Sequence, residues 1–362
     1  MWNWFRAVDV EIVDLGIPAR HFHWKKASAI NRTVDQFQTY IQLIHRTARA
    51  LREREIDIVD GRMEMGTVVA TLAGRLAGVK AVTSTKYTPW TGGERWFRRG
   101  PPLPWSLFGQ GIYALVDAVI CDSVTCLDAI RQGMVLPPPG YCIPNGIEPP
   151  RAERSREELT TEFGIPLGAK IVAQIARLWP TKGQDLLLEA APLILAQQPD
   201  AFFLVVGYTG QTQVALDYRD RLDQMVQTQG LGDRVRIVAY PGSIGDIWQL
   251  VDVHAHPTRL DSSPIALLES MSLGKPAVTS RVGGIPELLV DGETGIILPP
   301  GDARTLANAI LSLLQNPCEA ARLGRNARQH YEAGYTTEVM ARRIEQVFEK
   351  VYATPRIRKS SA

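Results

Sequence analysis

Short apolar runs alternate along the chain with segments whose apolar residues recur at helical spacing. The runs predict strands, and the periodic segments predict amphipathic helices. In the first half we expect strands at 8–15, 57–60, 81–85, 118–121 and 141–143 and helices at about 33–54, 66–77, 106–116 and 123–132. Because strands that alternate with helices form parallel sheets covered on both faces, the first half predicts such a sheet.

The same pattern starts again after a linker at 148–157, EPPRAERSRE, whose paired prolines and charges mark a domain boundary. Beyond it we expect strands at 170–175, 202–206, 234–239, 251–255 and 276–280 and helices at 184–196, 214–229, 243–250, 302–315, 318–332 and 336–353. The predicted fold class is α/β, with two Rossmann-like doubly wound domains that face each other across a cleft. We place these domains at 1–147 and 148–335, and expect helix 336–354 to pack back on the first.

Composition and charge add few constraints. The 362 residues are 45% hydrophobic and 22% charged, which is ordinary for globular proteins, and the net charge of +2 gives no reason to expect nucleic-acid binding. No apolar run has the length of a membrane span, and the first residues lack the pattern of a signal peptide. The four cysteines show no C-x-x-C spacing. We therefore expect a cytoplasmic protein with reduced thiols.

Candidate chemistry concentrates in residues 258–287, TRLDSSPIALLESMSLGKPAVTSRVGGIPE. Ser263 followed by Pro264 predicts a helix start, with a serine cap and a proline in the first turn. The free backbone N–H groups of such a start, around Ser263–Ile265, suit an anion. Glu269 lies roughly 8 Å farther along that helix, a spacing that suits a long ligand such as a sugar nucleotide. The alternative is an amphipathic helix with a solvated Glu269.

Two cations follow the strand that opens the second half. Arg177, just before the turn LWPTKG, and Lys182, within it, would hold both phosphates of a diphosphate, or stabilise its charge as it leaves. A solvated basic turn is the alternative. Gly207, after the next strand, permits close backbone approach but also fits an ordinary turn. Gly283 and Gly284 would bring backbone N–H groups near a phosphate or sugar, or simply form another turn.

Acids and histidines complete the candidate set. Asp261 would accept hydrogen bonds from sugar hydroxyls, and Glu269 from ribose hydroxyls. His254 and His256 share one face of a predicted strand, but no third metal ligand is evident near them. The chain has no G-x-x-x-x-G-K-[ST] loop, which disfavours a P-loop kinase, and no D-x-D pair at a strand end where a divalent metal would bind.

Several of these segments resemble the retaining glycosyltransferases of the GT-B fold, which use nucleotide-sugar donors. Asp261 to Glu269 resembles the E-x-x-x-x-x-x-x-E segment of that family, and MSLGKPAVTS and GGIPE follow in the family's order. DGETGIILPPGD at 291–302, ARLWPTKGQD around Lys182 and IPNGIE ending at Glu148 match as well. The resemblance extends over nearly the whole chain.

The resemblance implies a site. Arg177 and Lys182 would bind the donor diphosphate, Glu269 the ribose and Asp261 the transferred sugar, while the backbone near Ser263–Ile265 would meet the diphosphate or sugar. A hexose would pass with retention from a UDP- or GDP-linked donor to a glycan or lipid-linked acceptor, as in polysaccharide or lipopolysaccharide synthesis, without a metal or other cofactor. A nucleotide-sugar epimerase and a non-catalytic donor-binding protein are the alternatives.

The chain departs from the family pattern at three places. Asp261 is one methylene shorter than the usual glutamate. The chain starts near the second strand of the pattern, which implies a misassigned start codon or a shortened protein without the Gly-rich loop. Lys86 and Tyr87 stand on the acceptor side, where a histidine is common.

Aromatic and arginine residues at 90–108 would contact a membrane or a lipid-linked acceptor, unless they pack on their own domain.

Overall fold

The computed structural model describes residues 29–86 and 103–354, with side chains at 38–86 and 107–354. The predicted strand 8–15, Tyr87 and residues 90–102 of the aromatic segment lie outside these ranges. The chain divides into two compact units. Unit 1 comprises residues 1–121, 129–141 and 345–362, and unit 2 comprises residues 122–128 and 142–344. The chain passes between the units at 141/142 and 344/345, where we predicted boundaries after 147 and 335, and the arrangement of the two units stays a prediction.

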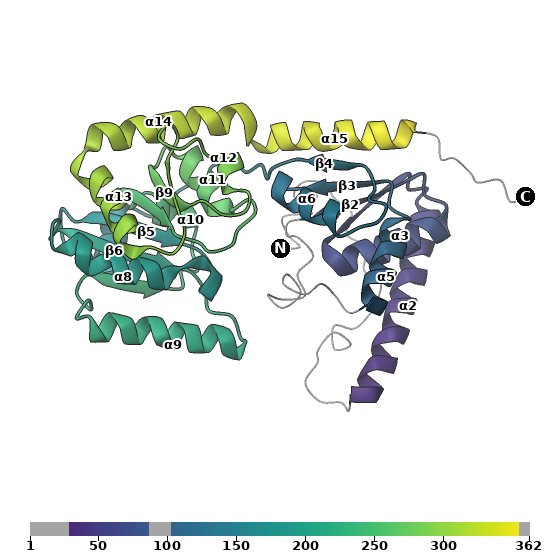
Figure 1. The fold of residues 1–362 in the computed structure, drawn as a ribbon, viewed down its shortest axis with the longest axis horizontal. Coiled ribbons are helices and arrows are strands. Elements are labelled where there is room, and N and C mark those ends of the chain that lie inside the picture. Colours follow the sequence, from purple (N-terminus) through teal and green to yellow (C-terminus); the bar gives the residue numbers. More distant parts are fainter. Residues whose placement is uncertain (1–28, 87–102, 355–362) are drawn as a thin grey trace, which may run out of the picture. The chain divides into compact units, whose positions relative to one another are not determined.

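Unit 1 is built on a parallel sheet with the strand order β1-β2-β3-β4. The strands are β1 (Ile58–Arg62), β2 (Ala81–Lys86), β3 (Ala118–Cys121) and β4 (Gly140–Cys142). Helix α2 (Ala29–Glu53) precedes β1, and α3 (Met63–Ala77), α5 (Leu103–Tyr113) and α6 (Val124–Gln132) connect the strands, although the first turn of α6 belongs to unit 2. Helix α3 packs on α2 and on β1 and β2 (Figure 1). Every residue of β2 and β3 is buried, as expected for strands covered on both faces.

Unit 2 contains a six-stranded parallel sheet with the order β10-β9-β8-β5-β6-β7. Its strands are β5 (Lys170–Ile175), β6 (Ala201–Val206), β7 (Val235–Val238), β8 (Val253–His256), β9 (Ala277–Ser280) and β10 (Ile296–Leu298). Strand β5 pairs with β6 on one side and with β8 on the other. The strand order therefore reverses between β5 and β8, and loops after such strands form the usual ligand site of an open α/β sheet.

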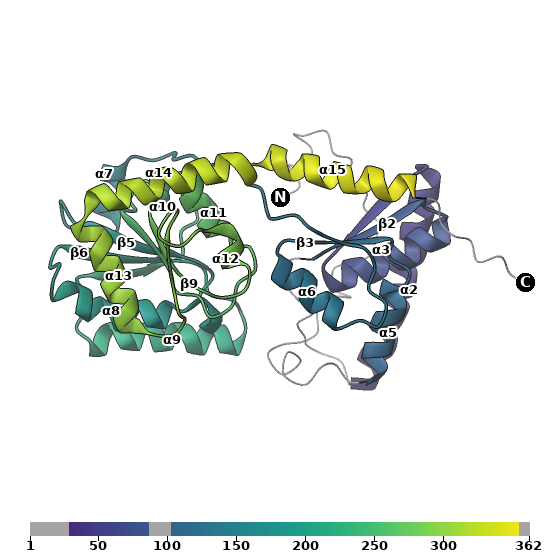
Figure 2. The ribbon, with the colours of Figure 1, turned by 45° about the horizontal axis from the view of Figure 1, so that its top comes forward.

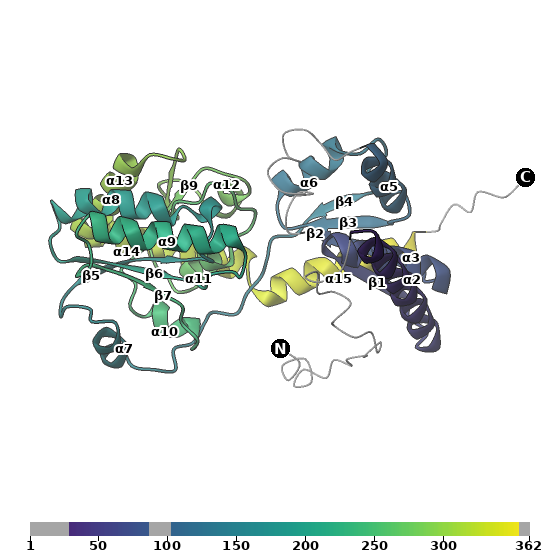
Figure 3. The same ribbon diagram turned by 90° about the horizontal axis from the view of Figure 1, so that it is seen from below.

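Helices cover both faces of this sheet. They are α7 (Arg156–Glu162), α8 (Gln184–Leu195), α9 (Gln213–Thr228), α10 (Ile244–Trp248), α11 (Ile265–Ser272), α12 (Ile285–Leu288) and α13 (Ala303–Gln315), with the 3₁₀ turn η2 at Pro180–Lys182. Helix α14 (Pro317–Gly334) packs on α11 and α13, and α15 (Thr337–Ala353) continues from unit 2 into unit 1, which contains its residues from 345 onward. Helix α13 packs on α8, which packs on α9 (Figure 2). Figure 3 shows α8 and α9 on one face of β5–β7, with α7 and α10 on the other. A buried apolar core fills the space on each face.

Three elements were not predicted from the sequence: α7, α12 and β10. The linker interpretation of 148–157 was wrong at its end, because α7 begins at Arg156. Ser155 and Glu158 form a capping box, in which each side chain hydrogen-bonds the other residue's backbone N–H. The helix also buries Leu159 completely in the core of that face. The last two charges of the predicted linker, Arg156 and Glu157, thus belong to the first turn of a capped helix.

Candidate functional site

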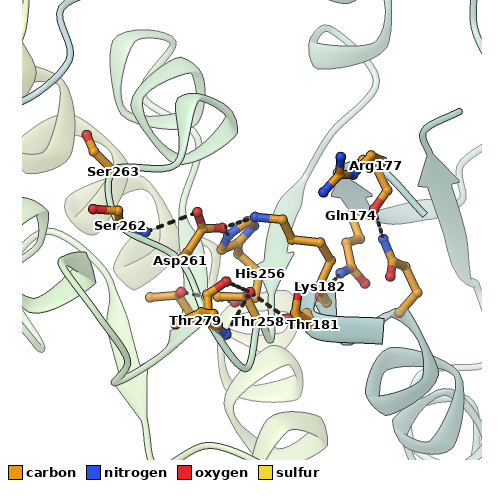
Figure 4. A network of polar contacts seen from close by, with 12 residues as sticks. Gln174, Arg177, Thr181, Lys182, His256, Thr258, Asp261, Ser262, Ser263 and Thr279 are labelled. Atoms are coloured by element: carbon orange, nitrogen blue, oxygen red, sulfur yellow. Dashed lines mark hydrogen bonds and ion pairs between the residues drawn. The ribbon is translucent and has the colours of Figure 1, made fainter. Parts of the chain in front are cut away.

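Three side chains of unit 2 meet at the carboxyl edge of its sheet (Figure 4). Oδ2 of Asp261 accepts hydrogen bonds from Nζ of Lys182 at 2.5 Å and from Nε2 of His256 at 3.1 Å. Oδ1 accepts the backbone N–H of Ser262 at 3.2 Å. Lys182 follows β5 and Asp261 follows β8, so the adjacency of these two strands brings together a cation and an anion that both belong to the predicted site.

The charge of Asp261 follows from these neighbours. Burial on its own would raise the pKa of this carboxyl, but the hydrogen bond from His256 and the positive charge of Lys182 outweigh burial and lower the pKa to about 2. Asp261 is therefore a carboxylate at neutral pH, although its side chain is only 13% exposed. A fixed, partly desolvated anion of this kind interacts strongly with polar ligands.

The loops that carry Lys182 and Asp261 are joined through their backbones. The carbonyl of Thr181 accepts hydrogen bonds from the Thr258 hydroxyl at 2.8 Å and from the Arg259 N–H at 2.7 Å. Gly183 has φ +72°, and a Cβ on it would lie 2.0 Å from a backbone oxygen of the second loop. Only glycine fits this approach, so the two loops form one platform rather than independent segments.

Arg177 lies on the loop of Lys182 but away from the Lys182–Asp261 pair (Figure 4). Its side chain is exposed, and its guanidinium lies 5.2 Å from the ring centroid of Trp179. Gly207 supports this loop, since a Cβ there would lie 1.9 Å from the Ala176 carbonyl oxygen. A close backbone approach was expected at Gly207, and the segment that approaches it is the loop of Ala176. This contact fixes the position of the backbone just before Arg177.

Gly283 and Gly284 contact the protein in a similar way. A Cβ on Gly283, whose φ is +51°, would lie 1.7 Å from the carbonyl oxygen of Asp261. A Cβ on Gly284 would lie 2.2 Å from the carbonyl oxygen of Ser262, and the Gly284 N–H donates to the Asp261 carbonyl at 3.3 Å. This loop therefore fixes the backbone that carries Asp261, and its contact with a ligand stays a prediction.

The predicted capping of α11 was wrong in detail. Pro264 is the N-cap, with φ −66° and ψ 122°, and no side chain caps the helix. Ser263 lies one position too early, and its buried hydroxyl has no partner among the described residues, while its carbonyl accepts from Asn145 at 3.0 Å. Helix α11 begins at the half-exposed Ile265, whose N–H has no acceptor in the described part of the chain.

Glu269 lies on α11, with its side chain turned toward Trp248. Oε2 of Glu269 accepts the Trp248 Nε1–H at 2.8 Å. Burial raises the pKa of Glu269, and the hydrogen bond from the indole partly offsets this effect. Trp248 is fully buried and packs edge-to-face on His254, whose ring in turn lies 5.6 Å from that of His256. No local sequence pattern identified Trp248, because its contact depends on tertiary packing.

Two further acids of unit 2 lie near these loops: Asp122, in the stretch 122–128, and Glu287, on α12. Asp122 accepts the Ser262 hydroxyl at 2.5 Å, and burial raises its pKa to about 7. Glu287 accepts the backbone N–H groups of Val124 and Thr125 at 2.7 and 3.0 Å, as an anion at a helix start should. Glu287 ends the GGIPE motif and Asp122 follows a predicted strand, so both positions were visible in the sequence but received no role.

The last points concern the acceptor-side candidate Lys86, a metal site and a membrane span. Lys86, at the end of β2 in unit 1, is 1% exposed and lies 5.6 Å from the ring centroid of Tyr113. Among residues 29–86 and 103–354, no group of three or more His, Cys, Asp or Glu is placed to hold a metal. In the same ranges, no helix is both long and apolar enough to cross a membrane.

Two family models match the chain, one over its N-terminal part and one over its C-terminal part. Residues 6–151 match the model of "Glycosyltransferase Family 4", and residues 155–330 match that of "Glycosyl transferases group 1". A D-inositol 3-phosphate glycosyltransferase from Corynebacterium urealyticum is 27% identical over 66% of this chain and 56% of its own. A GDP-mannose-dependent phosphatidylinositol monomannoside mannosyltransferase from Corynebacterium glutamicum is 26% identical over 84% of this chain and 79% of its own. The chain spans about half the length of the inositol phosphate enzymes that it matches.

Two solved structures illustrate the similarity of this fold to known proteins. Anabaena HepE in complex with UDP and glucose superposes with a TM-score of 0.72 and 21% identity, over 84% of this chain and 81% of that chain. A glycosyltransferase from Rickettsia africae superposes with a TM-score of 0.75 and 15% identity, over 98% of this chain and 88% of that chain. At these identities the likeness concerns the fold.

Proposed function

Because this chain belongs to the GT-B glycosyltransferases, we propose that it transfers a hexose, with retention, from a nucleotide-sugar donor to a glycan or lipid-linked acceptor. The observation that carries the proposal is the ion pair of Lys182 and Asp261 at the strand-order reversal of unit 2. Ligands of doubly wound sheets bind at this position. The named relatives act on inositol phosphate and on a mannosylated lipid, and both are compatible with such an acceptor.

In this mechanism the cations act on the leaving group. Lys182 and Arg177 neutralise the donor diphosphate. They also stabilise the negative charge that develops on the diphosphate as the sugar leaves, and we assign the larger part of this effect to Lys182. Asp261 accepts hydrogen bonds from hydroxyls of the transferred sugar, since it is ionised. The departing diphosphate takes the proton of the acceptor hydroxyl. No metal or other cofactor has a role in this scheme.

The nucleoside end of the donor is assigned to α11. Oε2 of Glu269 already accepts from Trp248, which orients the carboxyl and leaves Oε1 for a ribose hydroxyl. The uncapped start of α11 at Ile265 offers a backbone N–H to the diphosphate or sugar. Lys86 and Tyr87 would serve the acceptor side in unit 1. The segment 90–108 would hold a lipid-linked acceptor at the inner face of a membrane.

Donor turnover tests the proposal. Purified protein is incubated with UDP-glucose or GDP-mannose, with and without inositol phosphate, phosphatidylinositol vesicles and EDTA, and the release of nucleoside diphosphate is followed. Release that EDTA does not abolish supports the transferase. Conversion of the donor into an epimeric sugar nucleotide would favour the epimerase. Tight binding without turnover would favour a donor-binding protein.

A further inference from the structure

His256 connects the site to an interior strand of the sheet in unit 2. It ends β8, which pairs with β5 on one side and with β9 on the other, and it is 1% exposed. Its carbonyl accepts the Thr279 hydroxyl at 3.0 Å. Residues in the interior of a sheet open far less readily than loop residues. The imidazole is therefore anchored to the sheet, whereas Lys182 and Asp261 lie in the loops beyond it.

The three donors to Asp261 differ in how well they can orient its carboxylate. Lys182 reaches Oδ2 from a flexible four-carbon stem, and the Ser262 N–H belongs to the next residue of the same loop. A carboxylate only accepts hydrogen bonds, so Nε2 of His256 carries the proton of the 3.1 Å bond to Oδ2. Of these three donors, only His256 is itself part of a strand. Lys182 contacts the sheet through its backbone, whose carbonyl accepts a hydrogen bond from Nε2 of Gln174 at 2.7 Å, while its side chain keeps its flexible stem.

We propose that His256 is a positioning residue for sugar transfer, which holds the carboxylate of Asp261 in the orientation that Lys182 binds. The inference rests on the proposed function, because it takes Asp261 to be the residue that meets the transferred sugar. An aspartate has a shorter reach than the glutamate of the family pattern, so its direction matters more. Displacement of a reacting group by about 1 Å costs on the order of 100-fold in rate.

The same strand supplies a matched control. His254 precedes His256 by two residues, is 0% exposed, and has no hydrogen-bond partner for either ring nitrogen in the described part of the chain. Burial lowers the pKa of His254 well below its ordinary value, so its ring is neutral. Leucine at either position removes a buried imidazole from β8. Only His256→Leu also removes a hydrogen bond to Asp261.

Steady-state kinetics of the full chain test the proposal. We expect His256→Leu to lower kcat by roughly 10- to 100-fold, with the donor KM changed less than about threefold, because orientation rather than binding is lost. His256→Gln places an amide donor near Oδ2 and should recover most of the loss, and His254→Leu should keep kcat within about twofold. Wild-type kcat in His256→Leu, or an equal loss in His254→Leu, overturns the proposal.

A second measurement separates this inference from the proposed function. If the wild-type protein releases no nucleoside diphosphate, the transferase proposal fails, whatever the variants do. Ring ¹⁵N resonances of the histidines, assigned with the two leucine variants, then decide the contact. Asp261→Asn should shift the Nε2 resonance of His256 and leave those of His254 in place. A His256 resonance that does not move shows that the carboxylate is not held by this ring.

Discussion

Replacing Lys182 by methionine removes the ammonium group and keeps most of the apolar stem. The ion pair that is lost is partly buried, since the side chains of Lys182 and Asp261 are 21% and 13% exposed. Exposed pairs contribute about 0–1 kcal/mol, and breaking a fully buried pair costs about 3–5 kcal/mol. His256 still donates to Asp261 in the variant, so we expect a loss of about 2 kcal/mol in the free energy of unfolding.

We expect Lys182→Met to reduce kcat much more than it reduces the stability of the fold. A loss of this size lowers Tm by about 4–8 °C for a domain of this size, which leaves the protein folded at 25 °C. Removing a donor that faces the developing charge costs about 10²- to 10³-fold in kcat. The assay compares nucleoside diphosphate release at saturating donor with Tm from scanning calorimetry.

Two controls isolate the position of the charge. Lys170 begins β5, at the strand end opposite the site, so Lys170→Met removes the same charge and should keep kcat. Lys182→Arg keeps a cation and should retain part of the rate. A Lys182→Met protein that turns over at the wild-type rate under saturating donor would refute the role of this residue.

The other predictions concern binding, pH and packing. Glu269→Ala should weaken UDP or GDP binding by roughly 10- to 100-fold, the cost of a lost charged hydrogen bond, and unchanged affinity by calorimetry would contradict the ribose role. Asp261, with a pKa of about 2 against 3.8, stabilises the fold fully above about pH 4 and loses about 2 kcal/mol as pH falls through 2. Asp261→Asn should abolish that slope in urea titrations. Asp122 has the opposite effect on stability, because its pKa is raised from 3.8 to about 7. Its contribution to the free energy of unfolding is complete below pH 3.8 and is lost as the pH rises through about 7. Asp122→Asn should flatten that decline, and an unchanged curve contradicts the burial of the carboxyl. Gly207→Ala places a Cβ 1.9 Å from a backbone oxygen and should cost about 1–3 kcal/mol in urea unfolding, whereas Gly210→Ala, with its nearest atom at 3.4 Å, should cost less.

Periodicity located most elements of the described chain because its strands are buried on both faces. Strand β5 has the predicted bounds, 170–175, and every residue of β6 is buried, as its unbroken apolar run suggested. The shortest elements were not predicted from the sequence. Helix α12 spans Ile285–Leu288 and β10 spans Ile296–Leu298, too short for either period to appear. The start of α7 was missed because Arg156 and Glu157, in its first turn, were interpreted as linker charges.

The chemistry of the site was predicted one residue at a time, but its contacts were not. Lys182 and Asp261 were each expected near the donor, yet their ion pair depends on β5 lying beside β8. Strand order is not encoded in local spacing. The contacts of His256 with Asp261 and of Trp248 with Glu269 have the same origin. The predicted cap, Ser263, lies one position before the observed N-cap, since the serine-proline signal locates a helix start only to within a residue or two.

Early-time ¹H NMR of the anomeric proton tests the central claim most directly. The protein is mixed with UDP-glucose or GDP-mannose and an inositol phosphate or phosphatidylinositol acceptor, and spectra are taken before the product can mutarotate. Retaining transfer predicts that nucleoside diphosphate appears together with a glycoside of the donor's own anomeric configuration, and that Lys182→Met suppresses both signals. An inverted product, an epimerised sugar nucleotide, or an intact donor in the presence of every acceptor would contradict it.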